Sequence, residues 1–240
     1  MGELVSGGSA GGGGFLPEFS SRANLYSRPT GEGAHALDEE FATAGAHGGT
    51  AVDVTGTIVG SKKSHLLTVA VAGQSANDVG VIVYPLTGIV AAPVTLETVM
   101  SANSALEANP MHGICFTDGV AAGSKIVSFG YIFDATDVAL QVRQGTLTAF
   151  STSTASKNTS GSSVYGTGQL WLRLVWSAAD TFKVLVSTDG EGWNIFNFAA
   201  SYASTITPTH FGVYGTAWAG TTTSHAGYEF LRIDESDKAS

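Results

Sequence analysis

The stretch from Gln169 to Phe198 constrains the fold of this chain most strongly, because it contains three strand patterns joined by two short turns. Its runs WLRLVW and FKVLVS are rich in β-branched and aromatic residues, and the second run alternates between its two faces. The turn after it contains Asp189 and Gly190, a pair that suits a tight β-hairpin because glycine tolerates positive φ. This stretch therefore predicts an antiparallel meander.

Further strand patterns lie on both sides of this stretch, and helical periodicity is almost absent. They cover residues 51–60, 65–73, 79–86, 112–119, 125–133, 138–150, 210–220 and 228–234. Residues 87–112 are compatible with a strand, a loop or a short helix, and residues 37–41 with one helical turn. Because no helices separate the strands, parallel βαβ architecture is excluded. The pattern predicts an all-β fold, an antiparallel two-sheet sandwich of the jelly-roll type.

The chain divides by composition into four parts. Residues 1–34 form a glycine-rich N-terminal arm, 35–49 a connector, 50–235 the sandwich and 236–240 a charged tail that we expect to fray. Glycine loses the most entropy on ordering, so the arm is ordered only against a partner surface. Its apolar residues Phe15, Leu16 and Phe19 are candidate anchors in a neighbouring subunit, whereas a plain linker is the alternative.

Charge and hydropathy exclude several classes of partner. The chain has 11 basic and 20 acidic residues and a formal net charge of -9, so it offers no basic stripe for nucleic acid. No apolar run is long enough for a transmembrane helix, and we expect no membrane partner. The first residues lack the basic and hydrophobic regions of a secretory signal. The single cysteine, Cys115, is expected to be a core residue, because it has no partner for an internal disulfide.

Several sequence segments carry a family resemblance. In order, they are GICFTDG, SFGYIF, WLRLVW, FKVLVSTDGEGW, HFGVYGTA and YEFLRID. This order resembles the concanavalin A-like lectin and glucanase superfamily, which includes laminin G-like domains and accessory sandwich domains of glycoside hydrolases. The resemblance covers residues 50–234, and its most specific piece is the Ser-x-Asp-Gly-x-x-Trp turn followed by a Phe-Gly-Val-Tyr strand. It implies a concanavalin A-like sandwich.

Catalytic motifs are missing from the sequence. Hydrolytic members of that superfamily carry a Glu-x-Asp-x-x-Glu strand, which supplies the two carboxylates of retaining hydrolysis, and this chain has none. The nearest acidic cluster, Asp38 to Glu40, is expected to be a solvated connector outside the sandwich. Nucleophile-elbow, zinc-protease, P-loop and dinucleotide motifs are also missing. We therefore expect no enzymatic activity.

We also expect no metal or other cofactor. The six histidines are scattered, without metal-ligand spacing. Sandwiches that this chain resembles often hold calcium, for which Asp53, Asp134, Glu229 or Asp234 could serve, but no calcium loop is visible.

Aromatic side chains on loops are the feature by which a lectin-like sandwich would bind sugars, because a pyranose ring stacks on them. The candidates are Trp193, Tyr202, Tyr214 and Trp218. Trp193 follows the Asp-Gly turn directly, so packing under its own hairpin is the stronger expectation for it. Trp218 lies among small residues and is the better candidate for a loop site.

Three functions compete at this level. The first is a non-enzymatic bacteriophage virion protein of the decoration or tail-fibre type, made in the host cytoplasm and homo-oligomeric. Its arm would dock onto other virion subunits and its sandwich would bind cell-surface glycans. The second is a stand-alone carbohydrate-binding module, and the third, least favoured, is a glycoside hydrolase.

Overall fold

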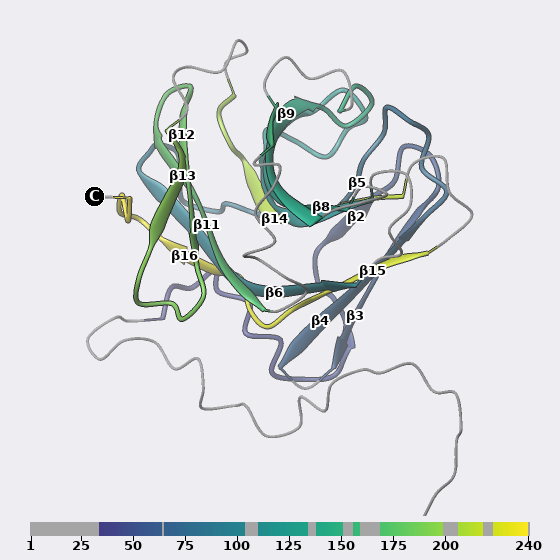
Figure 1. The fold of residues 1–240 in the computed structure, drawn as a ribbon, viewed down its shortest axis with the longest axis horizontal. Helices are drawn as coiled ribbons and strands as arrows, with labels where there is room; N and C mark the ends of the chain where they lie inside the picture. Colours follow the sequence, from purple (N-terminus) through teal and green to yellow (C-terminus); the bar gives the residue numbers. More distant parts are fainter. Residues whose placement is uncertain are drawn as a thin grey trace, which may run out of the picture. The chain divides into compact units, whose positions relative to one another are not determined.

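The computed structural model of the chain describes residues 34–63, 65–103, 110–133, 138–150, 156–158, 169–198, 206–217 and 223–239. The predicted anchors Phe15, Leu16 and Phe19 lie outside these residues. The described part contains no helix and forms two antiparallel sheets (Figure 1). The expected all-β two-sheet sandwich is therefore confirmed.

One sheet has nine strands, which run along the left and bottom of Figure 1. Its order is β1 (Gly45–Ala46), β3 (Thr57–Lys63), β4 (Leu66–Ala72), β15 (Ser224–Tyr228), β6 (Val94–Asn103), β11 (Leu170–Ala178), β12 (Thr181–Ser187) and β13 (Asn194–Phe198), with β16 (Arg232–Asp234) paired to β6. The predicted meander of residues 169–198 is β11, β12 and β13, at one edge of this sheet.

The other sheet has seven strands and curls above the first in Figure 1. Its order is β10 (Ser156–Asn158), β9 (Val138–Thr146), β8 (Lys125–Phe133), β7 (Met111–Thr117), β14 (His210–Thr216), β5 (Gly80–Pro85) and β2 (Thr50–Val52). Gly113 of β7 and Gly130 of β8 face each other. A Cβ atom on Gly130 would lie 2.0 Å from the carbonyl oxygen of His112, so this close strand approach requires glycine.

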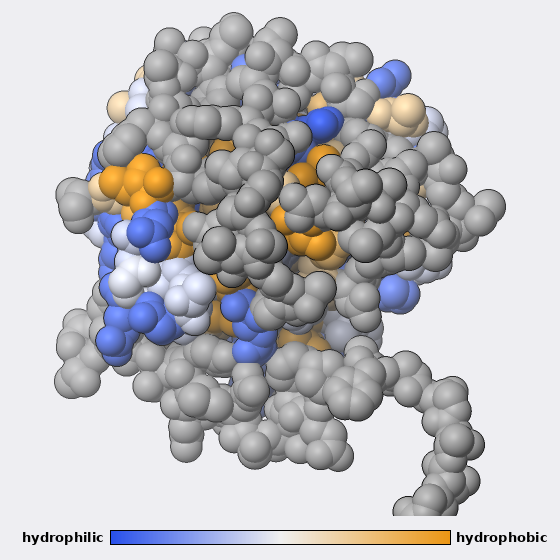
Figure 2. Space-filling model, viewed as in Figure 1, coloured by the Kyte–Doolittle hydropathy of each residue, from blue (hydrophilic) through white to orange (hydrophobic). Residues whose placement is uncertain are grey.

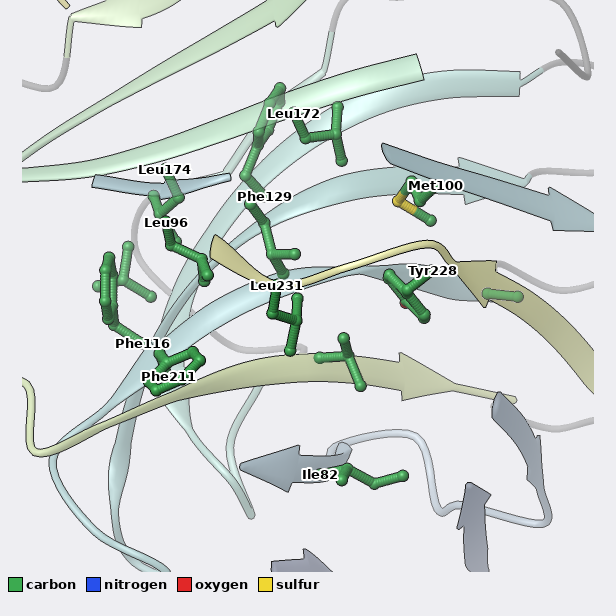
Figure 3. Close-up of a cluster of buried hydrophobic side chains, with 14 of the residues drawn as sticks. Ile82, Leu96, Met100, Phe116, Phe129, Leu172, Leu174, Phe211, Tyr228 and Leu231 are labelled. Atoms are coloured by element: carbon green, nitrogen blue, oxygen red, sulfur yellow. The ribbon is translucent and has the colours of Figure 1, made fainter. Parts of the chain in front are cut away.

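The core lies between the sheets and follows from strand alternation. Figure 3 shows Phe116, Phe129 and Phe211 of the seven-stranded sheet meeting Leu96, Leu172 and Leu174 of the nine-stranded sheet. All of these side chains are fully buried. The single cysteine, Cys115, is also fully buried, and burial raises the pKa of its thiol. The expectation that it is a core residue is confirmed.

Some element predictions were wrong or incomplete. The open segment 87–112 contains β6, and β10 lies within residues 151–168, which read as a polar loop. The pattern 51–60 is split between β2 and β3, because residues 53–56 cross from one sheet to the other. Strand β15 was missed: its sequence SHAGY buries only small residues and one tyrosine, so it lacks an apolar alternation.

The acidic cluster is bound to the sandwich, which corrects the expectation of a solvated connector. Glu39 and Leu231 form a β-bridge in which each backbone N–H donates to the other carbonyl oxygen at 2.8 Å. Asp38 Oδ1 accepts the N–H of Ile233 at 2.9 Å. The Glu40 carboxylate accepts two bonds from the Arg232 guanidinium, at 2.7 and 3.1 Å.

Residues 37–41 consequently form no helical turn. Phe41 has a φ of 47° and is 2% exposed, so the segment ends with its ring in the core. The C-terminal tail is also attached rather than frayed. Lys183 Nζ lies 2.8 Å from Asp237 Oδ2, and Ala239 is buried over β11 and β12.

Candidate functional site

One end of the sandwich gathers polar connections between the two sheets. We call it the polar end and define it as residues 53–56, 73–79 and 217. The strands that lead into it are in register: Val52 pairs with Val81, Ala72 with Thr57 and Gly215 with Gly80. Loops that are far apart in sequence therefore meet here.

A hydrogen-bond network around Asp78 holds the polar end together. Its Oδ2 accepts the hydroxyl of Thr55 at 2.5 Å and that of Ser75 at 2.7 Å. The N–H of Ser75 donates to Thr55 Oγ1 at 2.9 Å. Asp78 is 5% exposed, whereas Thr55 and Ser75 are exposed. The buried carboxylate thus positions two surface hydroxyls, a common arrangement for groups that recognise ligand hydroxyls.

Gln74 connects this network to the end of β14. Its side-chain amide donates to the carbonyl oxygen of Thr57 at 2.8 Å and accepts the N–H of Ala217 at 3.0 Å. The next residue in the sequence is Trp218, the favoured candidate for sugar binding, which lies outside the described residues. Its role stays a prediction.

Sequence reasoning missed the residues of this network. Residues 73–78 were interpreted only as a turn, because Gly, Ser, Asn and Asp are typical of turns. Their meeting with Thr55 depends on how the sheets pair, and a single sequence does not display that pairing.

Tyr214 is not an exposed aromatic, which corrects its assignment as a candidate. It lies on β14, is 1% exposed, and its ring centroid is 5.6 Å from that of Phe150. Residues 147–150 cover this face of the seven-stranded sheet: the N–H of Val79 donates to the carbonyl oxygen of Leu147, and that of Phe150 donates to the carbonyl oxygen of Asn77.

The candidate Tyr202 lies outside the described residues. In the sequence it precedes β14, whereas Trp218 follows β14.

Trp193 is half-buried and packs against Val175 and Leu185, on the face of the nine-stranded sheet that points away from the core. It contacts residues of its own hairpin. The Arg173 guanidinium carbon lies 3.7 Å from its ring centroid, and its Nε1 donates to the carbonyl oxygen of Gly190 at 2.9 Å. Trp171 meets it edge-on, with centroids 6.4 Å apart. Arg173 therefore covers one ring face of Trp193. Where Figure 2 displays the side of the molecule that holds β11 to β13, apolar and hydrophilic residues lie next to one another.

The turn before Trp193 is held by Asp189. Its Oδ1 accepts the N–H groups of Glu191 and Gly192, each at 2.9 Å. These bonds, the one from Gly192 first, lower the pKa of Asp189 to about 2. Asp189 is therefore a turn residue.

The calcium candidates are not gathered in the described part of the chain. Asp53 follows β2, Glu229 accepts a bond from Gln169, and Asp234 pairs with Lys238 at 3.0 Å. Asp134 lies outside the described residues. Among the residues that are described, no three His, Cys, Asp or Glu side chains are placed to hold a metal ion. Nor does this part of the chain contain a helix with the length and apolar character to span a membrane.

A buried serine and histidine form a pair that sequence spacing did not reveal. His112 Nε2 lies 2.6 Å from Ser224 Oγ, and both side chains are buried. Burial, together with the nearby His225, lowers the pKa of His112 to about 3. The residues are 112 positions apart in sequence and lie on β7 and β15, which belong to different sheets. Because both side chains are enclosed, they do not present a nucleophile to solvent.

Comparison with known proteins shows similarity of fold. No protein-family model matches the sequence, and no curated protein matches it. A functionally unknown protein from Saccharomyces cerevisiae is similar with a TM-score of 0.57 and 9% identity, over 79% of this chain and 97% of that one. At this identity the likeness concerns the fold alone.

Two GH43 proteins have a similar fold in part of their length. BlXynB from Bacillus licheniformis gives a TM-score of 0.53 at 12% identity, over 87% of this chain and 41% of that one. A bifunctional GH43-CE protein from Bacteroides eggerthii gives 0.54 at 10% identity, over 84% of this chain and 26% of that one. This chain therefore spans less than half of either protein. The likenesses agree with the expected jelly-roll sandwich.

Proposed function

We propose that this chain is a non-enzymatic carbohydrate-binding protein of a bacteriophage virion, with the polar end of its sandwich as the sugar-binding surface. One observation carries the sugar-binding part: the sandwich has a fold similar to a portion of two GH43 proteins, a glycoside hydrolase family.

The chemistry of the polar end supports the same proposal. Thr55 and Ser75 present hydroxyls that Asp78 holds in place, and the loops around them expose further polar groups. Sugar hydroxyls are recognised by such hydroxyl, amide and carboxylate groups beside an aromatic ring. Trp218 follows this network in sequence and would supply the ring.

The virion part of the proposal is supported by the organisation of the sequence. A glycine-rich segment precedes the sandwich, and charged residues make up only 13% of the chain. In this proposal residues 1–34 dock onto other virion subunits through Phe15, Leu16 and Phe19. The sandwich is then displayed toward the host surface.

A glycan array tests the sugar-binding surface. We expect the unaltered chain to bind at least one glycan and Trp218→Ala to lose most of that binding, since stacking on one aromatic ring contributes about 1 kcal/mol or more. Trp193→Ala is the matched control and should keep binding. The melting temperature of Trp218→Ala should stay unchanged, because a drop would mark Trp218 as a packing residue.

Other outcomes separate the alternatives. Loss of binding in Trp193→Ala alone would move the site to the outer face of the nine-stranded sheet. Release of sugars from a polysaccharide, abolished by replacing one carboxylate, would make the chain a hydrolase and overturn the proposal. An array without any bound glycan would remove the sugar-binding role.

A further inference from the structure

The end of the sandwich opposite the polar end has a different character. We call it the apolar end and define it as residues 86–93, 118–124, 177–180 and 206–209. These connections leave strands at paired positions: His210 lies opposite both Pro85 and Thr117, and Trp176 lies opposite Val94. The loops therefore emerge at one end of the molecule, although they are far apart in sequence.

Small apolar side chains cover the tips of these loops. Val90 is 85% exposed and Val120 is 40% exposed. Exposed alanines stand beside them and on the β11–β12 turn: Ala91, Ala121, Ala122, Ala178 and Ala179. Exposed apolar residues that recur on neighbouring loops mark an interaction surface rather than scattered surface residues.

Charge is scarce at this end. The residue ranges of the apolar end contain two acidic residues, Asp118 and Asp180. These ranges contain no glutamate, lysine or arginine. Asp118 Oδ1 accepts the N–H of Lys125 at 2.7 Å, so this carboxylate closes its own loop. Asp180 has one carboxylate oxygen buried. Neither carboxylate is fully presented to a partner.

The loops are held in place before any partner binds. The N–H of Leu86 donates to Thr209, and the N–H of Thr209 donates to Thr117, both at 2.8 Å. In the loop after β7, Ser124 N–H donates to the carbonyl oxygen of Ala121 at 2.9 Å, and Ala121 N–H donates to Ser124 Oγ at 3.0 Å. Pre-formed loops with short side chains lose little conformational entropy on association.

We propose that the partner of the apolar end is a second copy of this chain, related by a rotation axis. Two copies with a formal charge of -9 each repel one another, and contact is favourable where carboxylates are absent. A partner of opposite charge would call for a charged face, whereas an uncharged apolar face is complementary to itself, as rotational symmetry demands. The defined ranges, their buried residues included, lie at the lower end of the roughly 20 to 30 residues that one side of a standard interface uses.

This assembly has a geometrical consequence that does not depend on sugar binding. Copies joined at their apolar ends carry their polar ends outward. Each oligomer then carries several polar ends, and multivalency strengthens weak binding where one ligand or surface reaches more than one of them.

Sedimentation of the full-length chain tests the interface. We expect the unaltered protein to form an oligomer and the variant Val90→Asp with Val120→Asp to sediment as a monomer, with self-association weakened at least about tenfold. Val59→Asp is the matched control, because Val59 is 60% exposed on β3, outside the apolar end. All three proteins should melt at nearly the same temperature, since Val59, Val90 and Val120 are all exposed.

Cysteine cross-linking gives a second readout. Cys115 is buried, so under oxidising conditions Ala121→Cys should form a disulfide-linked dimer and Val59→Cys should not. A monomeric unaltered chain at every concentration would overturn the proposal, including the case in which the true partner is another protein. Oligomers that persist in the Val90→Asp, Val120→Asp variant would place the interface elsewhere, for example in residues 1–34.

Discussion

His112 determines how this fold responds to acid. It lies on the inner face of β7, bonded to Ser224, and its Nδ1 has no hydrogen-bond partner. Burial keeps the imidazole neutral by lowering its pKa from 6.5 to about 3. The unfolded chain binds a proton below about pH 6.5, whereas the folded chain does not. The contribution of His112 to stability is therefore complete above pH 6.5 and is lost as the pH falls toward 3.

Replacement of His112 tests this pH dependence. Between pH 6 and pH 4 a buried neutral histidine contributes a slope of up to about 1.4 kcal/mol per pH unit. We expect His112→Leu combined with Ser224→Ala to flatten the fall in unfolding free energy over this range by that amount, as measured by urea titration. His225→Gln, which alters an exposed histidine, should leave most of the slope in place. An unchanged slope in the double variant would show that carboxylates alone cause acid unfolding.

Gly190 makes a second residue-scale prediction. Its φ is 81°, and a Cβ atom there would lie 2.7 Å from the Trp171 ring. Gly190→Ala should lower the unfolding free energy by about 2 to 4 kcal/mol, through backbone strain and overpacking together. Gly88→Ala is the matched control, because Gly88 has a φ of 87° but nothing within 4 Å of its Cβ position. Equal losses in the two variants would mean that Trp171 moves aside without cost.

At the scale of elements, the segment before β1 behaves as part of the nine-stranded sheet. Asp38 supplies an acceptor to Ile233 of β16, and Arg232 of that strand binds Glu40. Hydrophobic alternation in the sequence does not predict this attachment, because two carboxylates and the backbone bridge between Glu39 and Leu231 make the contact. A run of acidic residues normally indicates a solvent-exposed segment. The acidic cluster was therefore assigned to the surface.

Asp38→Ala tests the attachment. The change leaves the N–H of Ile233 without its acceptor, so we expect a loss of about 1 to 3 kcal/mol in the unfolding free energy from denaturant titration. Glu235→Ala is the control, since the Glu235 pair with His35 is largely exposed and contributes less than about 1 kcal/mol. A loss below that of the control would mean that water replaces the carboxylate.

Strands were predictable where burial alternates with exposure. Residues Leu66–Ala72 alternate fully, and the predicted limits of this strand agree with β4 to within one residue. The prediction missed strand β15 because His225, Ala226 and Gly227 lie between buried Ser224 and Tyr228 and give no apolar alternation. β15 lies between β4 and β6, whose side chains fill the core beside it, so its own side chains can be small. A sequence of small residues is typical of a loop, and the strand is then not recognised.

At the scale of the whole molecule, the sequence was sufficient for the fold class and insufficient for the sites. Apolar alternation without helices limits the chain to a sandwich or a barrel. Which loops meet depends on strand order, since Thr55 and Asp78 come together only through the pairing of β2 with β5. The polar and apolar ends follow from this order and from no local motif.

Deletion of residues 1–34 tests the arm at this scale. We expect the shortened chain to fold, with an unchanged near-ultraviolet spectrum, because it keeps the hydrogen bonds of the described sandwich from His35 onward. It should fail to enter virions, as measured by its amount in purified particles. Normal incorporation of the shortened chain would end the anchoring proposal, and an unaltered full-length chain found only outside particles would favour a stand-alone carbohydrate-binding module.

The bridge between Glu39 and Leu231 also decides where mechanical load enters the sandwich. Tension on the chain before residue 35 reaches this bridge, the Asp38 bond and the Glu40 pair with Arg232. Leu231 directly precedes strand β16, which carries the other two contacts and pairs with β6, and β6 lies between β15 and β11. A pull is thus delivered to the interior of the nine-stranded sheet and not to an edge strand, so the sheet is loaded as a block instead of being peeled strand by strand.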